Sequence, residues 1–266
     1  MSFREVCIAS KCNNLITLKN GNIELILLDL GATIGRVAGR TKDAKVVFYG
    51  TIYYLEKNYQ DKHTLHGRFN SITLQKFAFE LIGTNKVNFT TPQKYVTDKF
   101  PANVTINVTY ERLENAIVIY FDAVAIANTI LNMTNHCYYN LSVDYKTKIV
   151  DHQLEVPATQ FVNVDDDLIP TDIQNLPQEM DFRQKFSTGD KLKYHDSKYF
   201  RRVGIDHCYI VDGIVVLEDS NSGRKLKLSS SYPAMQIYIC NVSREHNLLM
   251  VKYSNNMMLF VLNRDM

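Results

Sequence analysis

Short runs in which apolar and polar residues alternate recur along the chain of 266 residues. An alternation with a period of two is typical of a β-strand that buries one of its faces. Between residues 15–19 and 23–28 lies the pair Asn20-Gly21, and Asn-Gly is a strong hairpin signal because both residues tolerate positive φ. No window of 12 or more residues keeps an apolar face with caps at both ends, so helix is expected to be a minor component.

The same pattern predicts strands along most of the chain, with polar turns between them. Beyond the hairpin, the expected strands are 45–49, 77–82, 104–110, 116–125, 129–133, 138–143, 208–211, 214–217, 225–228, 235–239 and 257–262. Many short strands separated by turns favour an all-β, antiparallel sandwich or barrel. No linker-like segment and no break in composition divides the chain, so residues 1–266 are expected to form a single domain.

The charge balance argues against a strongly charged partner. The 30 Lys and Arg residues oppose 28 Asp and Glu residues, and no concentrated basic stripe indicates a nucleic-acid surface. No run approaches the ~18 consecutive apolar residues that span a bilayer, and the first residues lack the apolar core of a signal peptide. The five cysteines are odd in number and lack tight paired spacing, which predicts reduced thiols and a cytoplasmic location.

Taken alone, the sequence motifs say little about chemistry. The chain has no Gly-rich phosphate loop, no His-Glu-x-x-His or paired CxxC metal motif, and no nucleophile elbow. Three histidines, His66, His136 and His207, stand beside polar residues near expected strand ends. Histidine is the side chain best suited to acid–base chemistry near neutral pH, but each of the three is equally compatible with a core or surface position.

Seven short segments, in chain order, resemble those of the aldose 1-epimerase (galactose mutarotase) family. They are 15–34, 35–40 (GRVAGR), 65–67 (LHG), 132–141 (NMTNHCYYNL), 165–171 with 181–183 (DDDLIPT and DFR), 204–209 (GIDHCY) and 236–241 (QIYICN). The resemblance implies a large antiparallel β-sandwich of the galactose mutarotase-like (supersandwich) type, in agreement with the alternating pattern.

The resemblance also implies an activity, the interconversion of the α and β anomers of a free aldohexose such as galactose or glucose. In the family a His acts as general acid on the ring oxygen, and a Glu near the C-terminus takes the proton from the anomeric hydroxyl, without metal or organic cofactor. By their match to the family motifs, His136 is the catalytic acid, and the substrate-binding residues are Arg40, His66, Asp206 and Gln236. His207 is expected to be structural, because it points away from Asp206 in a regular strand.

Three departures from the family pattern affect this prediction. Gly39 stands where the family has a sugar-binding Asn, and the family segment between Ile34 and Gly35 is missing. Leu262 or Asn263 stands where the family has its Glu, in a C-terminus that is shorter than the family's. Neither residue can take a proton, and the loss of a positioned acid or base costs ~10²–10⁴-fold in rate.

The sequence therefore leaves three functions open. The favoured one is a divergent mutarotase-like protein that keeps part of an aldohexose site but is catalytically impaired. The alternatives are an active epimerase whose base is Glu245 or Asp265, and a module repurposed to bind an unknown protein partner. A chain rich in Asn, Lys, Ile and Tyr and lacking Trp also fits a pared-down copy in a large DNA virus. No cofactor, metal, nucleic acid or membrane partner is expected.

Overall fold

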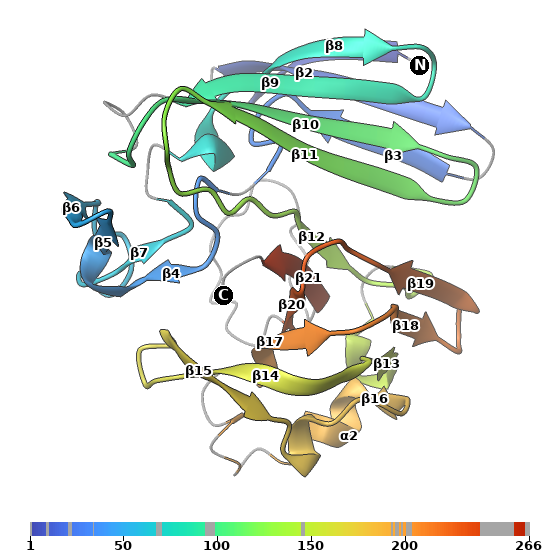
Figure 1. Cartoon of the computed structure of the whole chain (residues 1–266). Coiled ribbons are helices and arrows are strands. Elements are labelled where there is room, and N and C mark those ends of the chain that lie inside the picture. The colour runs from blue at the N-terminus through green and yellow to red at the C-terminus, as the bar shows by residue number, and fades with distance from the viewer. Residues whose placement is uncertain are drawn as a thin grey trace. The chain divides into compact units, whose positions relative to one another are not determined.

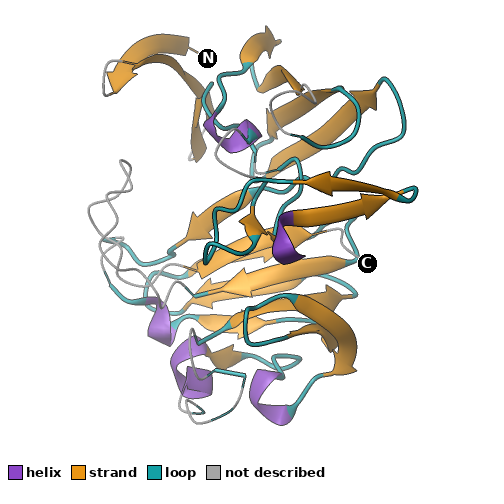
Figure 2. Ribbon diagram, turned by 90° about the vertical axis from the view of Figure 1, so that its left-hand side faces the viewer, coloured by secondary structure: helices purple, strands orange, loops and turns teal. Residues whose placement is uncertain are grey.

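The computed structural model (Figure 1) describes residues 2–8, 11–20, 23–33, 35–67, 71–93, 99–144, 147–192, 194, 197, 199–200, 204–239 and 258–263. Contacts divide the chain into two compact units, residues 1–134 and 135–266, and each is described by itself. The expectation of a single domain over residues 1–266 stays a prediction. Within the described residues the regular structure is almost entirely β, with one short α-helix, α2 (Thr188–Leu192), and a few 3-10 turns, as expected (Figure 2).

The first unit contains two antiparallel sheets that share one hydrophobic core. Their orders are β1-β2-β3 and β11-β10-β9-β8. The strands are β1 (Ser2–Ile8), β2 (Lys11–Asn20), β3 (Ile23–Leu28), β8 (Ala78–Ile82), β9 (Lys86–Gln93), β10 (Val104–Arg112) and β11 (Ile117–Ala125). Ile16 of β2 packs in the same core as Phe89 of β9 and Ile106 of β10, so this unit is a β-sandwich.

The hairpin predicted from Asn20-Gly21 is present. β2 and β3 pair antiparallel with Asn20 opposite Ile23, and the two residues that connect them lie outside the described residues. Two small sheets complete the unit: β4 (Arg40–Thr41) with β7 (Thr64–Leu65), and β5 (Lys45–Phe48) with β6 (Thr51–Tyr54). A short 3-10 turn, η1 (Lys42–Ala44), lies between β4 and β5, and another, η2 (Ile72–Leu74), lies between β7 and β8.

The prediction of a strand at residues 129–133 is wrong. This segment has only an isolated bridge, between Asn132 and Val37. Its backbone is used otherwise: the carbonyl of Ile130 accepts from Nε of the buried Arg36, and that of Asn132 accepts from the backbone N–H of Ala38. The strand expected at 138–143 is also shorter than predicted, since β12 ends at Tyr139.

The second unit is likewise built from two antiparallel sheets. Their orders are β12-β21-β20-β17-β14-β15 and β16-β13-β18-β19. The strands are β12 (His136–Tyr139), β13 (Gln153–Glu155), β14 (Ala158–Val164), β15 (Pro170–Asn175), β16 (Phe186–Ser187), β17 (Asp206–Val211), β18 (Val215–Asp219), β19 (Arg224–Leu228), β20 (Ala234–Tyr238) and β21 (Met258–Asn263). The 3-10 turns η3 (Ile149–Asp151) and η4 (Gln178–Met180) connect some of them. Leu217 of β18 shares a core with Tyr209 of β17 and Ile237 of β20.

The cysteines differ in part from the expectation of reduced thiols. Cys12 is disulfide-bonded, which corrects that expectation for this residue. Cys137 and Cys208 form no disulfide bond, and both are half-buried. No helix in the described part of the chain is long and apolar enough to cross a membrane.

His207 lies on the core face of β17, as expected. Its ring centroid is 6.2 Å from that of Phe161 and 6.0 Å from that of Phe200, and its Nε2 donates to the carbonyl of Tyr199 at 3.0 Å. Burial lowers the pKa of His207 to about 4, although the charge of Asp206 opposes the shift. The histidine is therefore a neutral core residue at pH 7.

This burial predicts a loss of stability on mild acidification. The unfolded chain binds a proton at His207 with a pKa of about 6.5, so it binds more protons than the folded chain as the pH falls from 7 to 5. The free energy of unfolding should fall by about 2 kcal/mol from this residue over that range. His207→Phe keeps a ring between Phe161 and Phe200. In this variant the free energy of unfolding, measured by urea denaturation, should differ between pH 7 and pH 5 by about 2 kcal/mol less than in the wild type. An equal pH dependence in both proteins would contradict the assignment.

Candidate functional site

Three of the predicted site residues lie on strands of the six-stranded sheet in the second unit. His136 is the first residue of β12, Gln236 is central in β20, and Asp206 begins β17. His136 and Gln236 are both register partners of Val261, and Gln236 is also the partner of Cys208, two residues from Asp206. Because side chains alternate along strands, these three residues share the face opposite the core.

A hydrogen bond between Gln236 and Asp206, and the electrostatic effect of Asp206 on His136, link the three side chains into what we call the His136 cluster (His136, Asp206 and Gln236). Nε2 of Gln236 donates to Oδ1 of Asp206 at 2.6 Å. Burial lowers the pKa of His136, while a backbone hydrogen bond and the negative charge of Asp206 act in the opposite direction. His136 is therefore neutral at pH 7. The Asp206 carboxylate stabilises the protonated form of His136 when that form occurs.

Two tyrosines occupy the same face and are not among the residues predicted for the site. The ring of Tyr138 lies 5.4 Å from that of His136, and Tyr238 is the register partner of Asp206. Tyr139, one residue along β12, packs instead against the core. Alternation along β12 puts only one of Tyr138 and Tyr139 on the face of His136, whereas Tyr238 can be placed on that face only from the register of β17 with β20.

The other two predicted residues, Arg40 and His66, lie side by side in the first unit. Arg40 is the register partner of Leu65, the residue before His66. The backbone N–H of Gly39 donates to Nδ1 of His66 at 3.1 Å, and the N–H of His66 donates to the carbonyl of Gly39 at 2.9 Å. The guanidinium of Arg40 lies over the ring of Tyr59, 5.0 Å from its centroid. Since Nδ1 accepts a hydrogen bond, a neutral His66 carries its proton on Nε2.

The backbone register of β21 bears on the two positions, 262 and 263, that the sequence predicts in place of the family Glu. Val261 is opposite both His136 and Gln236, Leu262 is opposite Met235, and Asn263 is opposite Ala234. Met235 belongs to the core. Of the two candidate positions, Asn263 therefore lies in a register row of the His136 face and Leu262 in a row of the core face. The segment Met258–Asn263 contains no Asp or Glu.

The His136 cluster combines groups suited to a polyhydroxylated ligand. A carboxylate accepts hydrogen bonds from sugar hydroxyls, and an amide beside it can both donate to and accept from a neighbouring hydroxyl. An imidazole can transfer a proton. Among the described residues, no group of three or more His, Cys, Asp or Glu side chains could hold a metal ion.

Comparison with known proteins identifies the family. Residues 20–257 match the sequence model of the family described as aldose 1-epimerase. The chain belongs to this family. It is 27% identical over 247 residues to the aldose 1-epimerase of Haemophilus influenzae, covering 90% of this chain and 70% of that protein. It is 29% identical over 221 residues to the galactose mutarotase of Mus musculus, covering 79% of this chain and 62% of that protein.

Solved structures of the aldose 1-epimerase family agree with the fold. The galactose 1-epimerase of Lactobacillus acidophilus superposes with a TM-score of 0.86 at 22% identity, over 98% of this chain and 89% of that one. An aldose epimerase homologue from C. elegans gives a TM-score of 0.78 at 23% identity, with the same coverage. The predicted all-β, antiparallel sandwich of the galactose mutarotase type is thus confirmed.

The electrostatic link between Asp206 and His136 can be tested directly. In Asp206→Asn the carboxylate charge that favours the imidazolium is gone, so the pKa of His136 should fall further below its usual value. The pKa can be measured from the NMR chemical shifts of the His136 ring across a pH titration. Asp181→Asn is the control. It also removes one carboxylate, but Asp206, and not Asp181, is the carboxylate that acts on the pKa of His136. Equal pKa values in wild type and Asp206→Asn would show that the two side chains are uncoupled.

Proposed function

We propose that this chain binds a free aldohexose through the His136 cluster and that its mutarotation of that sugar is impaired. The observation that supports binding is the hydrogen-bonded Asp206–Gln236 pair next to a half-buried, neutral histidine. Membership of the aldose 1-epimerase family makes a sugar the ligand of choice. Arg40 and His66 are proposed as sugar-contacting residues on their match to the family motifs.

The proposed impairment concerns one proton. Opening a pyranose ring needs an acid at the ring oxygen and a base at the anomeric hydroxyl, and His136 is proposed as the acid. The family Glu is replaced by Leu262 or Asn263, and the register favours Asn263 as the equivalent position. An amide cannot accept the proton. Glu245 and Asp265, the substitute bases considered from the sequence, lie outside the described residues.

Binding and catalysis can be measured separately on the intact protein. Calorimetric titration with D-galactose and D-glucose should show sugar binding, and Gln236→Ala should weaken it about 2- to 10-fold, the effect of one neutral hydrogen bond. Polarimetry of freshly dissolved α-anomers should show little acceleration by the wild-type protein. Strong acceleration that is lost in His136→Ala would establish the active epimerase instead, and no binding of either sugar would favour the protein-interaction module.

A gain of function should follow when the base is restored. Asn263→Glu should raise the polarimetric rate at saturating sugar and recover part of the ~10²–10⁴-fold contribution of a positioned base. Leu262→Glu is the matched control, because the same carboxylate then lies in a register row of the core face and should give no rate increase. Equal rates for the two variants would contradict the register argument.

Gly39→Asn tests the other departure from the family. Gly39 has φ +85°, and Asn tolerates positive φ better than most residues, so the variant should fold. A restored sugar contact should lower KM without raising kcat. If Gly39→Asn alone produced turnover, a base other than the family Glu would already be in place. The cytoplasmic location and the viral source stay predictions.

A further inference from the structure

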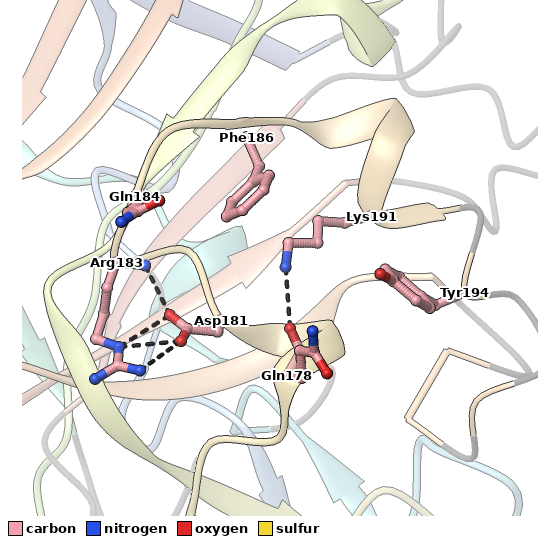
Figure 3. Close-up of a pocket in the computed structure, with 7 residues that line it drawn as sticks. All are labelled: Gln178, Asp181, Arg183, Gln184, Phe186, Lys191 and Tyr194. Carbon is pink, nitrogen blue, oxygen red and sulfur yellow. Dashed lines mark hydrogen bonds and ion pairs between the residues drawn. The ribbon is translucent and has the colours of Figure 1, made fainter.

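A pocket of about 660 Å³ opens in the second unit, and none of the residues that line it belongs to the His136 cluster. It is formed by η4, by the turn at residues 181–184, by β16 and α2, and by Tyr194 just beyond the helix (Figure 3). The turn contains the Asp-Phe-Arg segment at 181–183, to which the proposed sugar site gives no role. Its middle residue, Phe182, is fully buried, while Asp181 and Arg183 line the pocket.

A buried lysine projects into this pocket. Lys191 of α2 is only 5% exposed, and its Nζ donates to the carbonyl of Gln178 at 3.0 Å. The Nζ atom also lies 4.1 Å from the centre of the Phe186 ring and 6.0 Å from that of Tyr194 (Figure 3). Burial lowers the pKa of this lysine, against the opposing charges of Asp181 and Glu179. An ammonium group has three N–H donors. The single hydrogen bond to the carbonyl of Gln178 replaces only part of the hydration that the group loses on burial.

The acidic residue of the pocket is already engaged. Oδ1 and Oδ2 of Asp181 accept from Nε of Arg183 at 3.0 and 3.1 Å, and Oδ2 also accepts from Nη2 at 2.6 Å. The backbone N–H of Arg183 donates to the same carboxylate. Arg183 holds the pKa of Asp181 below its usual range. This pairing takes up the acceptors of Asp181, whereas the guanidinium of Arg183, which is 58% exposed, has five N–H donors and uses only some of them here.

The lining therefore has more hydrogen-bond donors than acceptors, and more positive than negative charge. Two cations, Lys191 and Arg183, face one carboxylate, and the amides of Gln178 and Gln184 are neutral. The exposed rings of Phe186 and Tyr194 add an apolar wall. The volume falls within the range of sites for small organic ligands and far exceeds that of a bare inorganic ion.

We propose that this pocket binds a small organic oxyanion, a phosphate monoester or a carboxylate, whose charged group contacts Lys191 and Arg183 and whose body lies against Phe186 and Tyr194. Charge-assisted hydrogen bonds from both cations hold the anion. The site is separate from the proposed sugar site, so either can exist without the other.

Calorimetric titration of the intact protein at low salt tests this site with three matched probes: glycerol 3-phosphate, glycerate and glycerol. They share a three-carbon body and differ in carrying a phosphate, a carboxylate or no charge. At least one of the two anions should bind, and the preferred one identifies the chemistry, whereas glycerol should not bind. Lys191→Met keeps the apolar stem between the rings and should lower the affinity about tenfold or more. Arg183→Gln, at an exposed position, should lower it severalfold.

Two control variants distinguish binding in this pocket from nonspecific attraction to surface charge and from binding in the proposed sugar site. Lys225→Met removes one positive charge from an exposed lysine that pairs with Glu218 outside the pocket, and it should leave the affinity unchanged. His136→Ala should also leave it unchanged, because loss of binding in that variant would place the anion in the proposed sugar site. The proposal is overturned if neither anion binds, if His136→Ala abolishes binding, or if Lys191→Met and Arg183→Gln both bind like the wild type.

Discussion

Strict alternation along β17 is the constraint on which the second unit depends. His207 and Tyr209 of this strand are buried in the core, while Asp206 and Cys208 face the other way and are half-buried. The register with β20 places His207 opposite the core residue Ile237 and Cys208 opposite Gln236. A slip by one residue would turn Asp206 into the core and expose Tyr209, at the cost of an unpaired buried charge and a large lost apolar area. Burial of His207 and Tyr209 on one face of β17 thus determines that Asp206 and Cys208 lie on the other face.

The same alternation explains which strands can be predicted from the sequence. β10 alternates buried residues with exposed or partly exposed ones over its whole length, and the pattern predicts it. The pattern misses β14, because Phe161 and Val162 are consecutive and both buried, and the pairing shifts register at two points along the strand. It misses β9 as well: Pro92 interrupts the alternation, and a buried Thr91 stands where an apolar residue would complete it. A bulge or a buried polar residue is decided by tertiary contacts that a single sequence does not contain.

The candidate sites are predictable to different degrees for a related reason. His136, Asp206 and Gln236 lie in regular strands within segments that resemble family motifs, so the resemblance can name them without any geometry. The pocket around Lys191 has no such signal. A lysine in a five-residue helix normally faces solvent, and only the packing of Phe182, Phe186 and Tyr194 around it makes Lys191 a buried cation. Those aromatic residues come from three different segments, and no periodic pattern relates them.

The choice between Leu262 and Asn263 shows how resemblance and register act as separate constraints. The motif comparison leaves both positions open. The backbone register has no information about the family, yet it assigns position 262 to the row of Met235 and position 263 to the row of Ala234, on the side of Gln236. Position 263 alone satisfies both constraints. In the proposed function, sugar binding depends on hydrogen bonds that the Asp206–Gln236 pair can provide without a base, whereas turnover depends on one proton acceptor. On that proposal a single replacement at position 263 removes catalysis and leaves the polar face of the sheet otherwise intact.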